Sequence, residues 1–217
     1  MNTPYEYIYK APKVTGDNQP AIFLLHGLGS NEQDLLQLVE GFEQNCHIFS
    51  LRGPIKHNPG YAFYTFPAEE GKPDRAIFEK VLQGTQAFIF EAIQEYGIAL
   101  DQVYIVGFNQ GAVVAQTLAL LMGNTIRGTV ALSGFLPDFV ELEYKKAAMD
   151  RSAIFISHGE YDYVYPASWG QASADYFESI DANVTFYSFE EGHGVTPDVL
   201  KAFTAFLMNT MPATLEN

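Results

Sequence analysis

Residues 103–115 read VYIVGFNQGAVVA, and this stretch decides how the chain folds. An apolar, β-branched run leads to Gly107, and Gly111 stands at the start of an apolar segment rich in small side chains. This order predicts a strand, a sharp turn and a helix, with Asn109 at the tip of the turn. Strand and helix come so close at the two glycines that a Cβ atom would be in the way. The tip residue is forced toward positive φ, so its side chain stands clear of the backbone.

Apolar runs and helical spacings alternate along the rest of the chain. Parallel strands joined by helices bury both faces of a sheet, so the alternation predicts an α/β fold: a single, mostly parallel sheet of about seven strands with helices on both faces. Functional residues of such sheets lie at the carboxyl ends of the strands. The sequence predicts strands at residues 5–10, 21–25, 47–51, 103–106, 128–132, 153–157 and 183–189, and helices at 31–43, 75–96, 110–122, 137–148, 167–180 and 197–208.

Composition limits the classes of function. The 217 residues suit a single domain spanning 1–217, and 47% hydrophobic with 18% charged residues is typical of a globular chain. A net charge of −14 argues against nucleic acid as a partner and against docking on anionic membranes. The N-terminus lacks the basic and apolar regions of a signal peptide, and no apolar stretch approaches the ~20 residues of a membrane span. We therefore expect a cytoplasmic protein with no membrane span.

Residues 52–74 form a long loop with neither strand nor helix periodicity, and such loops are often functional. Its aromatic residues Tyr61, Phe63 and Tyr64 either pack as a satellite cluster or line a substrate cleft, and both readings stay open. The loop is also the only feature that favours self-association, for example as a homodimer. Cys46, the lone cysteine, lies in an apolar run and is expected to be buried.

The turn at residues 107–111 has the layout of the G-x-S-x-G elbow that presents the nucleophile of α/β-hydrolases. In that fold the acid and then the histidine follow along the chain, and Asp162 and His193 occupy those places. An oxyanion hole needs two backbone N–H groups, which we expect from Leu28 in an H-G-x-G loop and from Gln110. The histidines and the cysteine show no metal-ligand spacing, so neither a metal nor a cofactor is expected.

Together these motifs resemble the phospholipase/carboxylesterase family, which includes bacterial carboxylesterases and acyl-protein thioesterases. The resemblance implies an α/β-hydrolase fold, a carboxylic ester, thioester or other small acyl ligand as partner, and catalysis without a cofactor. It also implies serine at position 109 and, in many members, a tryptophan in the loop that here carries Tyr61. The matching segments are 26–30, 52–54, 107–111, 132–137, 158–166 and 192–194.

Asparagine at position 109 is a poor nucleophile, because its nitrogen lone pair is delocalised into the carbonyl group. Loss of a triad nucleophile costs on the order of 10⁶ in kcat. Asparagine nevertheless tolerates positive φ, so we expect the fold to survive.

Three accounts of Asn109 are open. It is a substitution in an active serine hydrolase, or it belongs to a natural pseudoenzyme that binds acyl or ester ligands, or another group does the chemistry. That group is either a water activated by His193 and Asp162, or an aspartate formed by deamidation, although Asn-Gln is not a fast deamidating pair.

Overall fold

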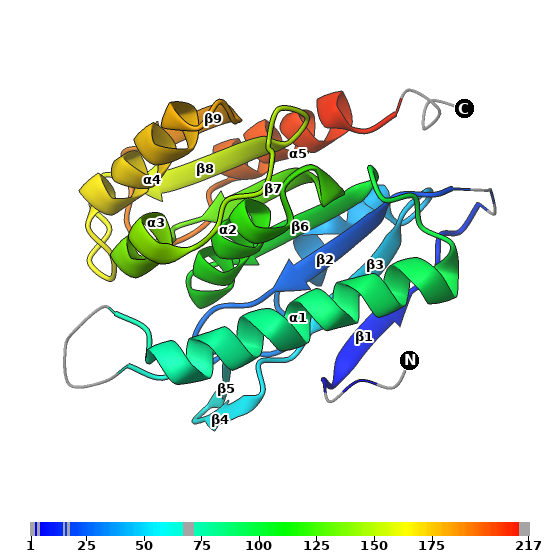
Figure 1. Ribbon diagram of the computed structural model, residues 1–217, viewed down its shortest axis with the longest axis horizontal. Coiled ribbons are helices and arrows are strands. Elements are labelled where there is room, and N and C mark those ends of the chain that lie inside the picture. The colour runs from blue at the N-terminus through cyan, green and yellow to red at the C-terminus, as the bar shows by residue number, and fades with distance from the viewer. Residues whose placement is uncertain (1–2, 4, 15, 17, 67–71, 213–217) are drawn as a thin grey trace.

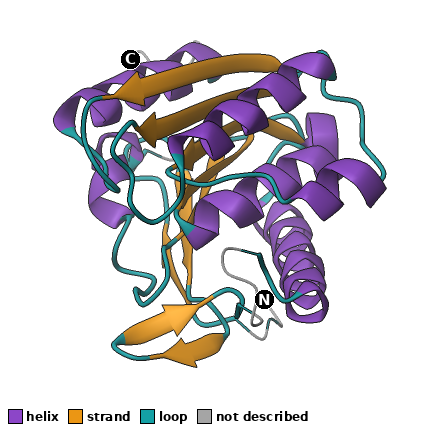
Figure 2. Ribbon diagram, turned by 90° about the vertical axis from the view of Figure 1, so that its left-hand side faces the viewer, coloured by secondary structure: helices purple, strands orange, loops and turns teal. Residues whose placement is uncertain are grey.

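The computed structural model describes residues 3, 5–14, 16, 18–66 and 72–212, and its centre is a seven-stranded sheet (Figures 1 and 2). The strand order is β1-β3-β2-β6-β7-β8-β9, with β1 antiparallel to β3 and every other neighbouring pair parallel. The prediction of a mostly parallel sheet is confirmed. The strands are β1 (Tyr7–Lys10), β2 (Ala21–Leu25), β3 (His47–Leu51), β6 (Val103–Phe108), β7 (Ile126–Leu132), β8 (Ala153–Gly159) and β9 (Asn183–Phe189).

Helices cover both faces of this sheet, because successive side chains of a strand point to opposite faces. In β2, Phe23 faces a core shared with α1 (Arg75–Tyr96), α2 (Gln110–Met122) and α4 (Ala167–Ser179). Its neighbour Ile22 faces the second core, which η1 (Leu36–Phe42) and α5 (Pro197–Thr210) cover. In Figure 1, α1 crosses in front of the sheet and α5 lies behind it. The remaining helices are α3 (Asp138–Glu143) and η2 (Gly123–Thr125), which like η1 is a 3₁₀ helix.

Local sequence explains where the long helix α1 starts and stops. The Asp74 side chain accepts a hydrogen bond from the Ile77 N–H at 3.1 Å and so satisfies one free donor of the first turn. Gly97 ends the helix in the left-handed region with φ +66°. Within the described residues, no helix is long and apolar enough to cross a bilayer.

The sharp turn between β6 and α2 has the predicted close approach. A Cβ atom on Gly107 would lie 2.3 Å from the Gly111 carbonyl oxygen. A Cβ atom on Gly111 would lie 1.8 Å from the Leu25 carbonyl oxygen of β2. Asn109 at the tip has φ 52° and ψ −116°, as the elbow requires of its central residue.

Three segments differ from the predictions, and the first is the predicted helix at 137–148, of which only α3 (Asp138–Glu143) is helical. The predicted helix at 31–43 is only the 3₁₀ helix η1, and Asn31 caps an Asx turn by accepting from the Gln33 N–H at 2.9 Å. The loop after residue 52 contains a two-stranded hairpin, β4 (Ile55–His57) and β5 (Gly60–Ala62), which no alternation had indicated. Residues 67–71 of the same loop lie outside the described part of the chain.

Candidate active site

Three side chains meet where β6, β8 and β9 end. Asn109 Nδ2 lies 3.0 Å from His193 Nε2, and His193 Nδ1 lies 2.8 Å from Asp162 Oδ2. Asn109 is on the elbow, Asp162 follows β8, and His193 lies in the loop between β9 and α5. The structure therefore brings together the three residues that sequence reasoning singled out, although they are separated along the chain by 84 and 31 positions.

The hydrogen bonds fix the orientation of the amide and the tautomer of the imidazole. The Leu28 backbone N–H donates to Asn109 Oδ1 at 3.1 Å, so the amide nitrogen must be the group that faces His193. That nitrogen can only donate, and Nε2 of His193 therefore accepts. The remaining ring hydrogen is on Nδ1, from which it donates to Asp162. This is the tautomer that a general base needs, with Nε2 free of a proton.

Asp162 is held rigidly for this task. Its Oδ1 atom accepts from the Val164 N–H at 2.8 Å and from the Tyr165 N–H at 2.9 Å. His158 Nε2 lies 3.3 Å from the Asp162 Oδ2 atom and 3.0 Å from the Tyr165 carbonyl oxygen, so Nε2 of this buried ring is the protonated nitrogen. His158 is thus a structural histidine, bonded to the backbone at Tyr165.

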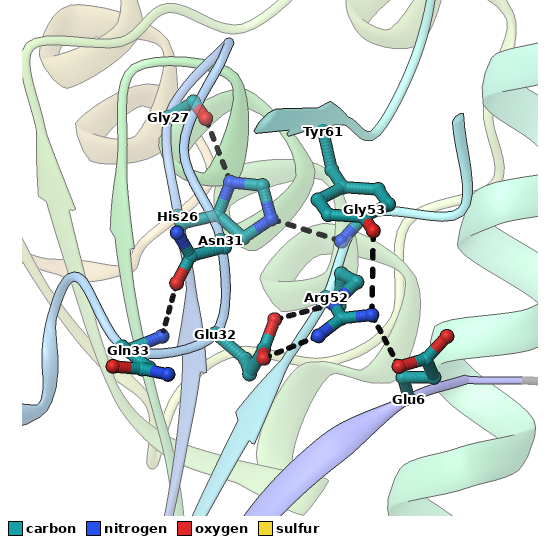
Figure 3. A network of polar contacts seen from close by, with 9 residues as sticks. All are labelled: Glu6, His26, Gly27, Asn31, Glu32, Gln33, Arg52, Gly53 and Tyr61. Carbon is teal, nitrogen blue, oxygen red and sulfur yellow. Dashed lines mark hydrogen bonds and ion pairs between the residues drawn. The ribbon is translucent and has the colours of Figure 1, made fainter. Parts of the chain in front are cut away.

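The loop that carries the Leu28 N–H is fastened by a polar network around His26 and Arg52 (Figure 3). His26 Nε2 accepts from the Gly53 N–H at 2.9 Å, so its Nδ1 carries the hydrogen and donates to the Gly27 carbonyl oxygen at 2.7 Å. Burial lowers the pKa of His26, and the ring therefore stays neutral. Protonation would remove the acceptor that ties residues 26–28 to the chain after β3.

Arg52 continues the network toward the protein surface. Its Nε and Nη2 atoms donate to the two oxygens of Glu32 at 2.5 and 2.6 Å, a bidentate pair that holds the pKa of Glu32 below its usual value. The guanidinium also pairs with Glu6 and lies under the Tyr61 ring, 4.6 Å from its centroid. The sequence singled out segment 52–54 as a family-like motif, but nothing in the sequence pattern predicted that Glu6 and Glu32 pair with Arg52.

The three loop aromatics, for which a satellite cluster and a substrate cleft were both open, have different surroundings in the structure. Phe63 and Tyr64 are fully buried in the core on the α1 side, and Tyr61 lies on Arg52. Phe63 and Tyr64 are therefore part of the main core and form neither a separate satellite cluster nor the wall of a cleft. The physical reason is the Gln110 side chain, which accepts from the Phe63 N–H at 2.9 Å and donates to the Tyr64 carbonyl oxygen at 2.8 Å, pulling the loop inward.

An apolar cavity of about 490 Å³ lies beside the site instead, between α3 and α4. Tyr165 separates it from His193: the Tyr165 ring centroid is 5.0 Å from that of Phe135 in the cavity wall and 6.0 Å from that of His193. Burial raises the pKa of Tyr165 to about 12. The cavity could not be predicted from the sequence, because its walls come from different segments of the chain. The apolar residues of these walls include Phe135, Leu136, Pro137, Phe139, Leu142 and Trp169.

The reacting groups are only slightly exposed to solvent. Asn109 is 6% exposed and the His193 side chain is 10% exposed. Within the described part of the chain, no three histidine, cysteine or acidic side chains are grouped so as to hold a metal ion. The chemistry that this arrangement supports is proton transfer by His193 next to a carbonyl group held by backbone N–H donors.

Sheet order, elbow and the placement of the polar residues define an α/β-hydrolase. The phospholipase/carboxylesterase family model matches residues 12–211, and the chain belongs to that family. It is 29% identical over 188 residues to acyl-protein thioesterase 1 of Debaryomyces hansenii, covering 78% of this chain and 81% of the relative. It is 26% identical over 221 residues to acyl-protein thioesterase 1 homolog 1 of Dictyostelium discoideum, covering 95% and 96%. The crystal structure of the Bacillus cereus carboxylesterase has the same fold, with a TM-score of 0.86, 24% identity and coverage of 97% and 96%.

Proposed function

We propose that the site is built to hydrolyse carboxylic esters or thioesters of acyl groups, and that Asn109 withholds the nucleophile from it. The observation that supports this most strongly is the unbroken chain of hydrogen bonds from Leu28 N–H through Asn109 and His193 to Asp162. Two relatives carry the name acyl-protein thioesterase, which supports an acyl thioester as one substrate class. A cytoplasmic location and a homodimer stay predictions.

With serine at position 109, each remaining group has a defined task. His193 Nε2 would take the hydroxyl proton while Asp162 stabilises the imidazolium that forms. The Leu28 N–H, together with the N–H of Gln110 at the positive end of α2, would bind the oxygen of the tetrahedral intermediate. His193 would then return the proton to the leaving alcohol or thiol, and water would release the acyl group by the same steps.

Asparagine blocks the first step in two ways. Its amide nitrogen is not nucleophilic, and its Oδ1 atom already accepts the Leu28 N–H that an ester carbonyl would use. The amide thus fills both the nucleophile position and part of the oxyanion hole. We expect the protein with Asn109 to turn over esters at least ~10³ times more slowly than its serine variant, given the ~10⁶ effect of nucleophile loss elsewhere.

The test is hydrolysis of p-nitrophenyl acetate, butyrate and octanoate by the protein and by Asn109→Ser, with fluorophosphonate labelling of both. Asn109→Ala is the matched control, because it empties the oxyanion hole without supplying a hydroxyl group. We expect turnover and labelling only with serine. A folded Asn109→Ser protein that neither turns over any ester nor takes the label would refute the proposal.

The apolar cavity favours a second candidate, a pseudoenzyme that binds acyl chains without cleaving them. Phe135 and Trp169 in the cavity wall both pack on the Tyr165 ring, which in turn packs on His193. A thermal-shift series with fatty acids of increasing chain length should raise the Tm of the protein as it stands. Ala172→Trp, which fills the cavity, should abolish the shift, and a shift that survives this change would place the ligand elsewhere.

A further inference from the structure

We propose that Asn109 is a site of self-modification: its side-chain amide loses ammonia by cyclising onto the backbone nitrogen of Gln110, and water then opens the ring to aspartate or isoaspartate. The amide occupies the position of a substrate carbonyl group, and three features of the site act on it at once. The reaction involves the chain's own atoms and water, and does not depend on which ester the site takes.

The first feature is the hydrogen bond at the amide oxygen. The Leu28 N–H donates to Asn109 Oδ1 at 3.1 Å and polarises the Cγ–Oδ1 bond. Attack on Cγ moves negative charge onto Oδ1, and the Leu28 N–H already donates a hydrogen bond to this oxygen. An exposed asparagine has only mobile water for this purpose.

The second feature is the proton carrier beside the leaving nitrogen. Asn109 Nδ2 lies 3.0 Å from His193 Nε2, and Asp162 holds the ring by its other nitrogen at 2.8 Å. An amide nitrogen leaves only as ammonia, so it needs a proton when the Cγ–Nδ2 bond breaks. His193 is within hydrogen-bond distance of the atom that must receive it.

The third feature is the backbone conformation. The substituents of Cα are spaced by about 120°, so ψ −116° brings the Cα–Cβ bond nearly into line with the bond from the Asn109 carbonyl carbon to Gln110 N. A five-membered ring through Cγ needs this eclipsed arrangement. Residues in helices or strands have ψ near −42° or +135° and would have to rotate first. The tight elbow, with Gly107 and Gly111 in close contact with neighbouring backbone, holds Asn109 at this ψ, so that only the side chain has to rotate for the ring to close.

The attacking nitrogen is also available. Gln110 is the first residue of α2, and N–H groups of the first turn have no acceptor within the helix. The bond from Gln110 N to Cγ forms, the N–H proton passes through His193 to Nδ2, and ammonia leaves. Water then adds to one of the two ring carbonyl groups and breaks its bond to nitrogen. The net change is an amide plus water giving a carboxylate plus ammonium.

The chain supplies its own control. Asn18 is followed by Gln19, the same dipeptide, and also has a positive φ of 56°, but it lies exposed in a turn, and no histidine among the described residues bonds to it. Crowding of the attacking nitrogen by a glutamine side chain is therefore equal at the two positions. A faster reaction at Asn109 would therefore be caused by the surroundings of Asn109 and not by the Asn-Gln dipeptide.

The experiment is incubation of the purified protein at neutral pH in ordinary and ¹⁸O-labelled water, followed by peptide mass spectrometry. We expect position 109 to gain about 1 Da, or about 3 Da in heavy water, at least tenfold faster than position 18, with isoaspartate among the products. His193→Gln, checked for folding by circular dichroism, should slow the change at 109 by at least tenfold and leave position 18 unchanged.

Three outcomes would overturn the proposal: no mass change at 109 while 18 reacts, equal rates at 109 with and without His193, or aspartate formed with no trace of isoaspartate or the cyclic imide. None of these readouts uses ester hydrolysis. An inert Asn109→Ser variant would refute the proposed function and leave the mass shift at 109 untouched, so the two failures can be told apart.

Discussion

Gly111→Ala tests whether the close approach of α2 and β2 sets the geometry of the site. A Cβ atom at this position would lie 1.8 Å from the Leu25 carbonyl oxygen and 2.8 Å from that of His26, whereas real Cβ contacts essentially never fall below 3.0 Å. Helix and strand must therefore separate by about 1 Å. That movement also weakens the hydrogen bond from the Gly111 N–H to the His26 carbonyl oxygen, now 3.2 Å.

The cost follows from these two effects. Overpacking a rigid interior costs about 1–3 kcal/mol, and leaving a buried backbone pair unsatisfied costs about 1–3 kcal/mol more. We expect the free energy of unfolding to fall by about 3–5 kcal/mol and the Tm to fall by roughly 10 °C.

Urea denaturation followed by circular dichroism gives the first number, and a thermal melt gives the second. Gly41→Ala is the matched control, because a Cβ atom there has nothing within 4 Å and should change stability by less than about 0.5 kcal/mol. If Gly111→Ala were as stable as Gly41→Ala, the contact would not constrain the elbow and the steric reasoning would be wrong.

The remaining predictions concern single groups. Burial raises the pKa of the Cys46 thiol to about 12, so a thiol reagent should label it only after urea unfolding; labelling of the native protein would contradict its burial. Burial also lowers the pKa of His26 in the folded protein. As the pH drops through about 6.5, the unfolded chain therefore binds a proton before the folded chain does, and the free energy of unfolding falls until the pH reaches the lower pKa of the folded state. Urea titrations at about pH 8 and pH 5 should show a smaller loss of stability for His26→Gln than for the parent, and equal losses would refute the assignment. In the Asn109→Ser background, Asp162→Asn should lower kcat by about 10⁴, because an amide at 162 favours the His193 tautomer with a proton on Nε2; an unchanged kcat would remove Asp162 from the mechanism.

Much of this architecture was predictable from sequence because its signals are local. The strand β2, buried on both faces, is a continuous apolar run, and β2, β3 and β9 begin and end at the predicted residues. The helix α1 was equally clear, since Gly97 marks its end. The elbow was also predictable, because two glycines flanking one residue between a strand and a helix are typical of such a turn.

The parts that sequence reasoning missed depend on contacts between distant segments. Nothing near Phe63 or Tyr64 indicates that the Gln110 side chain draws their backbone inward, so their burial was not predictable. The apolar cavity likewise has walls from separate parts of the chain. Glu32 was expected to lie in a helical segment, but it turns inward to meet Arg52 at 2.5 Å. Contacts of this kind join segments that are distant along the chain, so neither hydrophobic periodicity nor residue propensity predicts them.

The left-handed backbone at position 109 also has an evolutionary consequence. The serine codons AGT and AGC differ from the asparagine codons by one nucleotide, and asparagine accepts φ 52° more readily than most residues do. A point mutation can therefore remove or restore a nucleophile on this scaffold without a folding penalty for selection to act on. Descendants of such a lineage could pass between catalyst and receptor while their expression and solubility stay the same.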